Sequence, residues 1–125
     1  EQPCPELAGL IEQGHLDDHF VRDVCTEYLE PLLSREIEVV VLGCTHFPFV
    51  QPLLEELTSG RIQFIDPAFE TSELVRRRLE GKDLFNPQKT AGTVSLYFTK
   101  DIELGDKLSA SFLNTSRRSI EHITL

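Results

Sequence analysis

Methionine is absent from the 125 residues, and the chain opens with Glu1-Gln2-Pro3. Because removal of an initiator before a bulky acidic residue is unusual, we expect a piece of a longer polypeptide. No apolar run approaches the roughly 18 residues that a membrane span requires. No basic segment followed by an apolar stretch opens the chain, so it carries no sign of export. We therefore expect a cytoplasmic protein without a membrane partner.

Basic residues are also scarce, with 12 Lys and Arg against 21 Asp and Glu, which gives a net charge of −9. Nucleic acids and anionic membranes both require a basic face on their protein partner. The balance therefore argues against either partner. It does not argue against a carboxylate ligand, because backbone amides alone can hold one.

Cysteine is limited to Cys4, Cys25 and Cys44. An odd number without C-x-x-C spacing is a poor disulfide framework, so reduced thiols in the cytoplasm are expected. The Cys-x-His spacing at Cys44 and His46 is a weak metal signal, since a zinc site needs about four ligands at recognisable spacing. We expect no metal ion.

Helical and strand patterns alternate along the chain, which predicts an α/β fold with parallel strand pairing. The run Ile37–Leu42 is continuously apolar and predicts a strand buried on both faces. Asp17 and Asp18 supply N-cap chemistry for the helix that follows them, and Asp101 for a later one. Helices are expected at 4–13, 20–32, 48–57, 67–79 and 101–113, further strands at 62–65, 94–99 and 120–125, and a loop at 81–92.

The segment Gly43-Cys44-Thr45-His46 follows the first strand and precedes a helix, where open α/β sheets bind their ligands. Gly43 lets a ligand approach the backbone. The positive end of the helix dipole is expected to favour a thiolate at Cys44. His46 lies on the same side of an extended segment as Cys44, so it could exchange protons with a ligand there.

Structural roles for these residues stay open at this point. A free cysteine is usually a small buried apolar residue, and a single histidine more often packs or forms hydrogen bonds than catalyses. A thiol enzyme with Cys44 as nucleophile and His46 as base is a further alternative, although the sequence indicates no third group that would orient the histidine.

The segment VVVLGCTHFPFV at residues 39–50 resembles the motif around the second catalytic cysteine of glutamate racemases. Four more segments resemble the same family, so that the resemblance covers nearly the whole chain as the C-terminal half of such an enzyme. They are Cys4-Pro5 through Gly14, residues 28–32 (YLEPL), residues 65–68 (IDPA), and residues 96–99 with Phe112-Leu113.

The resemblance implies a two-lobed fold of the aspartate/glutamate racemase type. Residues 1–66 would belong to the second lobe, and residues 67–125 would pack on a first lobe that the chain lacks. It also implies an isomerase that supplies D-glutamate for peptidoglycan, and so for cell-wall biogenesis and cell shape. Two cysteines would move protons without pyridoxal phosphate or another cofactor.

Individual roles follow from the same resemblance. Cys44 would be one of the two catalytic thiols, and His46 would assist its proton transfer. Thr45 would help to hold the substrate carboxylate beside Gly43, and Glu12 would be a polar group near the site. Cys4 and Cys25 would not replace the missing cysteine, because Cys25 lies on an apolar helix stripe and Cys4 is expected on the far side of this unit.

The chain should therefore carry half an active site, completed by the missing N-terminal half, and be inactive alone. Apolar surface left uncovered at 73–79 and 94–99 would favour self-association, for example as a homodimer. Two alternatives remain: a non-catalytic fragment or binding module that keeps the fold, and a racemase for aspartate or another amino acid.

Overall fold

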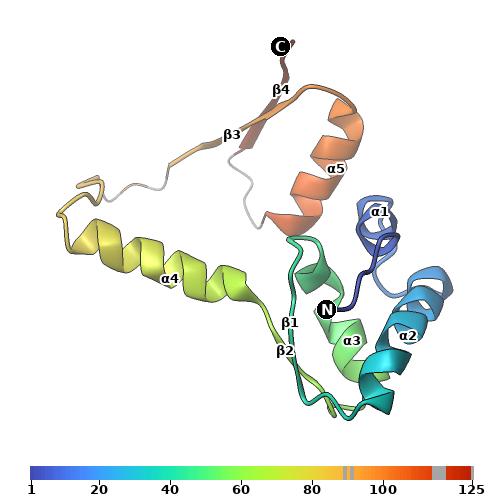
Figure 1. Ribbon diagram of the computed structural model, residues 1–125. Helices are drawn as coiled ribbons and strands as arrows, with labels where there is room; N and C mark the ends of the chain where they lie inside the picture. The colour runs from blue at the N-terminus through green and yellow to red at the C-terminus, as the bar shows by residue number, and fades with distance from the viewer. Residues whose placement is uncertain (89, 91, 114–117, 125) are drawn as a thin grey trace. The chain divides into compact units, whose positions relative to one another are not determined.

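Helices and parallel strands alternate in the computed structural model, which describes residues 1–88, 90, 92–113 and 118–124 (Figure 1). The α/β class with parallel pairing is thus confirmed. None of the described helices is long and apolar enough to cross a membrane. The elements are α1 (Leu7–Glu12), α2 (His19–Ser34), β1 (Val39–Val41), the 3₁₀ helix η1 (Phe47–Val50), α3 (Gln51–Leu57), β2 (Gln63–Ile65), α4 (Pro67–Glu80), β3 (Val94–Phe98), α5 (Ile102–Phe112) and β4 (Arg118–His122).

The chain divides into two compact units, Glu1–Leu84 and Phe85–Leu125. In the first unit β1 and β2 pair in parallel, with Val40 opposite Phe64. The segment between these strands contains η1 and α3, which return the chain to the start of the neighbouring strand, as parallel pairing requires. The strand–helix–strand order expected from the sequence is therefore present.

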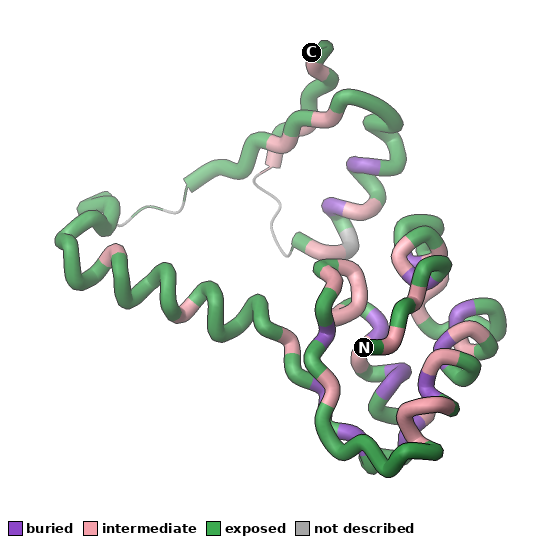
Figure 2. The backbone as a smooth tube through the Cα atoms, in the orientation of Figure 1, coloured by how far each residue is buried: buried purple, intermediate pink, exposed green. Residues whose placement is uncertain are grey.

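The hydrophobic core of the first unit lies among α1, α2, α3 and one face of the β1–β2 pair, where buried residues cluster in Figure 2. Its members recur at helical spacing on the three helices, which is why these segments fold as amphipathic helices. The buried apolar residues are Leu7, Ile11, Val21, Cys25, Leu29, Leu42, Val50, Leu53, Leu54, Ile62 and Phe64.

Two helices of this unit begin at aspartates whose side chains accept backbone hydrogen bonds. Asp18 accepts from the N–H groups of Phe20 and Val21 at the start of α2. Asp66 accepts from the N–H of Ala68 at 2.9 Å, and Pro67 occupies the first position of α4. These caps satisfy N–H groups that have no partner inside the helix.

Helix α4 has no buried residue, and its apolar side chains Leu74 and Val75 are each 51% exposed (Figure 2). The helix instead carries ion pairs along its surface, in which Arg76 contacts Glu73 and Glu80. The uncovered apolar surface expected at 73–79 is therefore present.

The prediction of a strand at Ile37–Leu42 that is buried on both faces is wrong. Strand β1 contains only Val39–Val41, and the side chains of Val39 and Val41 are 50% and 60% exposed. The sheet of the first unit has only two strands within the described residues, and the core formed with α1, α2 and α3 covers one of its faces. An apolar run predicts burial, but burial on both faces needs a covering layer on each side.

In the second unit β3 and β4 pair in parallel over five residues, and α5 lies between them in the sequence. Gly105 of α5 is buried against the ring of Phe98 in β3, where an added Cβ would lie 2.7 Å from the ring atoms. The predicted side-chain cap at Asp101 is wrong: Asp101 adopts a left-handed conformation (φ 48°) and forms no capping hydrogen bond. The last strand begins at Arg118 rather than at Ile120, and the predicted final residue, Leu125, lies outside the described residues.

Candidate active site

The Gly43–His46 loop connects the carboxyl end of β1 to η1 and forms a tight turn. The turn is closed by hydrogen bonds from the Phe47 N–H to the Cys44 carbonyl (3.2 Å) and from the Phe49 N–H to the His46 carbonyl (3.0 Å). The N–H groups of residues 43–46 themselves donate no hydrogen bond to any described residue. Successive amides of this kind can bind an anion.

Gly43 itself leaves open space at the strand end. A Cβ added there would meet no atom within 4 Å, and its φ is not in the left-handed region. The expectation that a ligand can approach the backbone at Gly43 is therefore compatible with the geometry. Thr45 is exposed, and its hydroxyl forms no hydrogen bond with the described part of the chain.

Cys44, His46 and Glu12 form a continuous chain of polar contacts. The Cys44 Sγ lies 3.7 Å from the His46 Nδ1, and the His46 Nε2 lies 3.0 Å from the Glu12 Oε1. The Glu12 carboxylate accepts a hydrogen bond from the protonated Nε2 of His46. The other ring nitrogen, Nδ1, therefore faces the thiol. The His46 and Glu12 side chains remain 31% and 50% exposed, which leaves the site accessible to a solute.

Sequence reasoning did not predict the contact between Glu12 and His46. The two residues are 34 positions apart, and no spacing rule joins the last residue of α1 to a loop after β1. Packing of α1 against η1 brings them together. The statement that no third group orients His46 is therefore corrected by the structure.

The helix that the sequence predicts from Pro48 begins at Phe47 as the 3₁₀ helix η1. The α-helix begins only at Gln51, since the residues Phe47–Val50 between the loop and α3 form a 3₁₀ helix. A helix dipole acts within the first turn, so the effect on Cys44 expected from an α-helix at Pro48 stays a prediction. The ionisable side chain that contacts this thiol is His46, whose Nδ1 lies 3.7 Å from the Cys44 Sγ.

A cavity of about 560 Å³ opens beside Cys44, with walls that are mainly apolar. Strand β1, helix α2 and the N-terminal segment enclose it, and the lining includes Leu29, Phe47, Leu54 and Phe64. Cys4 lines the same cavity as Cys44. The expectation that Cys4 lies on the far side of the unit is therefore wrong, because the N-terminal segment runs back along the strand end.

The other two thiols differ from Cys44 in their surroundings. Burial raises the pKa of Cys25 to about 11, with a smaller contribution from Cys4, and its side chain has no exposed surface. Burial is also the main cause that raises the pKa of Cys4, and the nearby Cys44 sulfur is a smaller one. Cys25 therefore behaves as the core residue that its apolar helix stripe predicts.

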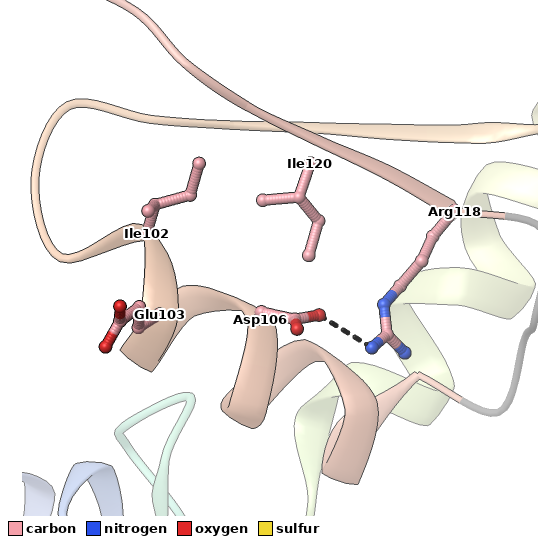
Figure 3. Close-up of a pocket in the computed structure, with 5 residues that line it drawn as sticks. All are labelled: Ile102, Glu103, Asp106, Arg118 and Ile120. Carbon is pink, nitrogen blue, oxygen red and sulfur yellow. Dashed lines mark hydrogen bonds and ion pairs between the residues drawn. The ribbon is translucent and has the colours of Figure 1, made fainter.

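A second cavity, of about 540 Å³, lies in the second unit between α5 and β4 (Figure 3). It holds an ion pair between Arg118 and Asp106 at 2.8 Å, flanked by Ile102 and Ile120. No residue predicted for the site lies there. Across the described ranges, no three His, Cys, Asp or Glu side chains are grouped so that they could hold a metal ion.

Comparison with known proteins places this geometry in context. No protein-family model matches the chain. It is 36% identical over 110 residues to a glutamate racemase of Clostridium perfringens strain 13, covering 85% of this chain and 42% of the relative. Two solved structures are also similar. The glutamate racemase of Francisella tularensis with D-glutamate has a TM-score of 0.84 and 26% identity, over 98% of this chain and 45% of that one. The glutamate racemase of Thermus thermophilus with β-chloro-D-alanine has a TM-score of 0.78 and 30% identity, over 98% and 46%.

The fold of this chain is thus the parallel α/β arrangement found in these isomerases. In sequence and in structure the chain resembles glutamate racemases, which confirms the family resemblance drawn from its motifs. The chain spans less than half the length of these relatives, in agreement with its resemblance to one half of the enzyme.

Proposed function

We propose that this chain supplies one half-site of a cofactor-independent glutamate racemase of the cytoplasm, which provides D-glutamate for peptidoglycan. The observation that carries the proposal is the Cys44–His46–Glu12 chain of contacts at a strand end. The relatives named above are glutamate racemases, and the Francisella structure holds D-glutamate.

Within this proposal Cys44 takes or returns the α-proton on one face of the substrate. His46 relays the proton from the thiol, and Glu12 keeps its ring oriented through the 3.0 Å contact. The N–H groups beginning at Gly43, which have no partner among the described residues, hold the α-carboxylate together with the Thr45 hydroxyl. A carboxylate held by fixed donors can accept the charge that develops when the α-proton leaves, which lowers the barrier.

Racemisation needs an acid and a base on opposite faces of one carbon, and Cys44 reaches only one face. Cys25 is buried in the core, and burial raises the pKa of Cys4, which lines the Cys44 cavity. We therefore propose that the second thiol comes from the missing N-terminal half. Residues 1–66 then form part of the second lobe, and residues 67–125 pack on the first.

The test is a chimera that joins the first half of the Clostridium perfringens relative to this chain. Circular dichroism of the substrate should record conversion of L-glutamate and of D-glutamate by the chimera. The 125-residue chain alone should give none and, on a sizing column, should associate through its exposed apolar faces. Cys44→Ala in the chimera should abolish conversion in both directions, while Cys25→Ala should retain most of it.

Two further arms separate the alternatives. If the chimera folds but racemises aspartate faster than glutamate, aspartate is the substrate in place of glutamate. If it binds glutamate without converting it, the chain is better described as a binding module. Incubation with a chelator should leave conversion unchanged, since we propose no metal. Activity that disappears with the chelator and returns with zinc would overturn this part.

A further inference from the structure

The Cys44 site contains, within this chain alone, the three parts of a thiol acyl-transfer centre. Such centres consist of a nucleophile, a base within hydrogen-bond reach, and a third group that orients the base. Here they are the Cys44 Sγ, the His46 Nδ1 at 3.7 Å, and the Glu12 Oε1 at 3.0 Å from the opposite ring nitrogen. Racemisation needs a second thiol from elsewhere, but this chemistry does not.

Stabilisation of an oxyanion requires donors that are not already used. The N–H groups of Cys44, Thr45 and His46 donate no hydrogen bond to the described residues. They belong to the residue that carries the sulfur and to the two residues after it, so they are the backbone donors nearest in sequence to the oxygen of an acyl group on that sulfur. Removal of one such preorganised donor typically lowers kcat by about 100- to 1,000-fold.

The cavity beside the sulfur provides a place for an apolar acyl group. Leu29, Phe47 and Leu54 line it together with Cys44, and its volume of about 560 Å³ lies in the range of small-molecule sites. The other thiols compete poorly there, because burial raises the pKa of both Cys25 and Cys4. A short aliphatic ester or thioester fits this combination of apolar wall and reactive sulfur.

We propose that this chain forms a thioester between Cys44 and short aliphatic acyl groups, and hydrolyses activated esters through it. His46 removes the thiol proton as the sulfur attacks the carbonyl carbon. The bond to the leaving group breaks, and the proton passes to the departing oxygen. Water then attacks the thioester while His46 takes one of its protons. The C–S bond breaks, the acid leaves, and the thiol is restored.

The test uses p-nitrophenyl butyrate with the complete 125-residue chain. Release of p-nitrophenolate should be at least about 100-fold faster than from the same chain unfolded in urea, which has identical thiols without their arrangement. Mass spectrometry after an acid quench should find one butyryl group on the Cys44 peptide. Cys44→Ala should remove both signals, whereas Cys25→Ala should keep them.

Glu12 is a positioning residue in this scheme, so its variants need a readout beyond loss of structure. Glu12→Gln should slow acylation about tenfold at saturating ester with little change in KM, and Glu12→Asp should restore part of the rate. His46→Asn provides a second variant and should slow acylation further.

Butyryl on Cys4 or a lysine, or a rate equal to that of the unfolded chain, would overturn the proposal. An unchanged rate in both Glu12→Gln and His46→Asn would overturn it as well. This result is independent of the test for racemisation. The chimera can fail to convert glutamate while the chain is still acylated, and the chimera can convert glutamate while the chain is not acylated.

Discussion

The shorter of the two pairs of parallel strands contains a buried residue, whereas the longer pair contains none. β1 and β2 pair over only three residues, yet Phe64 in β2 is buried against the helices. β3 and β4 pair over five residues, and none of their residues is buried. Packed helices rather than ladder length therefore create the core, and the buried apolar residues of the described chain all lie in the first unit.

The largest expected effect comes from the same substitution on the covered and the uncovered helix. Leu53→Ala in α3 removes a side chain that is 3% exposed, and should lower the free energy of unfolding by about 2–5 kcal/mol. Leu74→Ala in α4 removes one that is 51% exposed and should change it by less than about 0.5 kcal/mol. Urea denaturation measures both. Equal losses would mean that α4 is covered in solution.

The core thiol should make the first unit lose stability in alkali. The folded pKa of Cys25, about 11, lies above that of an unfolded thiol, so the folded state holds its proton more tightly. The resulting stability is complete below about pH 8.5 and declines as the pH rises toward 11. Two pH units correspond to about 2–3 kcal/mol at most.

Unfolding curves between pH 7 and pH 11 measure this loss, with Cys25→Ala as the control. The variant should lack that part of the decline, whereas Cys44→Ala should retain it. A decline of the same size in wild type and Cys25→Ala would show that other groups cause it.

Removing the aspartate caps of α2 and α4 should affect stability differently, globally for α2 and only locally for α4. Asp18→Ala removes the cap of α2, whose inner face lies in the core, and should cost about 1 kcal/mol of global stability. Asp66→Ala removes the cap of α4, which buries no residue, and should reduce helical circular dichroism without moving the unfolding midpoint. A shift of the midpoint by Asp66→Ala would contradict this separation.

The smallest expected effect concerns surface ion pairs. Arg22 of α2 contacts Glu56 of α3 at 2.9 Å, and Arg76 contacts Glu80 within α4 at 3.1 Å. Glu56→Gln should lower global stability slightly because Glu56 links two packed helices, whereas Glu80→Gln should weaken only the local helix α4. Added salt should diminish both effects in thermal unfolding, and a larger loss from Glu80→Gln would reverse the ranking.

Local patterns in the sequence predicted most elements and the position of the reactive loop. Each of these signals lies within a few residues: the apolar residues at helical spacing, the capping aspartates at 18 and 66, and the apolar run before Gly43. Three features depend on distant packing and were not predictable from such signals: the exposure of Val39 and Val41, the contact of Glu12 with His46, and the position of Cys4 beside Cys44.

The α5–β3 contact sets a limit on how the second unit can change during evolution. Because a methyl group at position 105 would lie 2.7 Å from the ring of Phe98, the two positions share one fixed volume. A lineage that acquires alanine at 105 should also carry a smaller residue at 98, and a reversion at either position alone should be selected against. The helix and the strand are therefore expected to vary together as a size-matched pair, although seven positions separate them in the sequence.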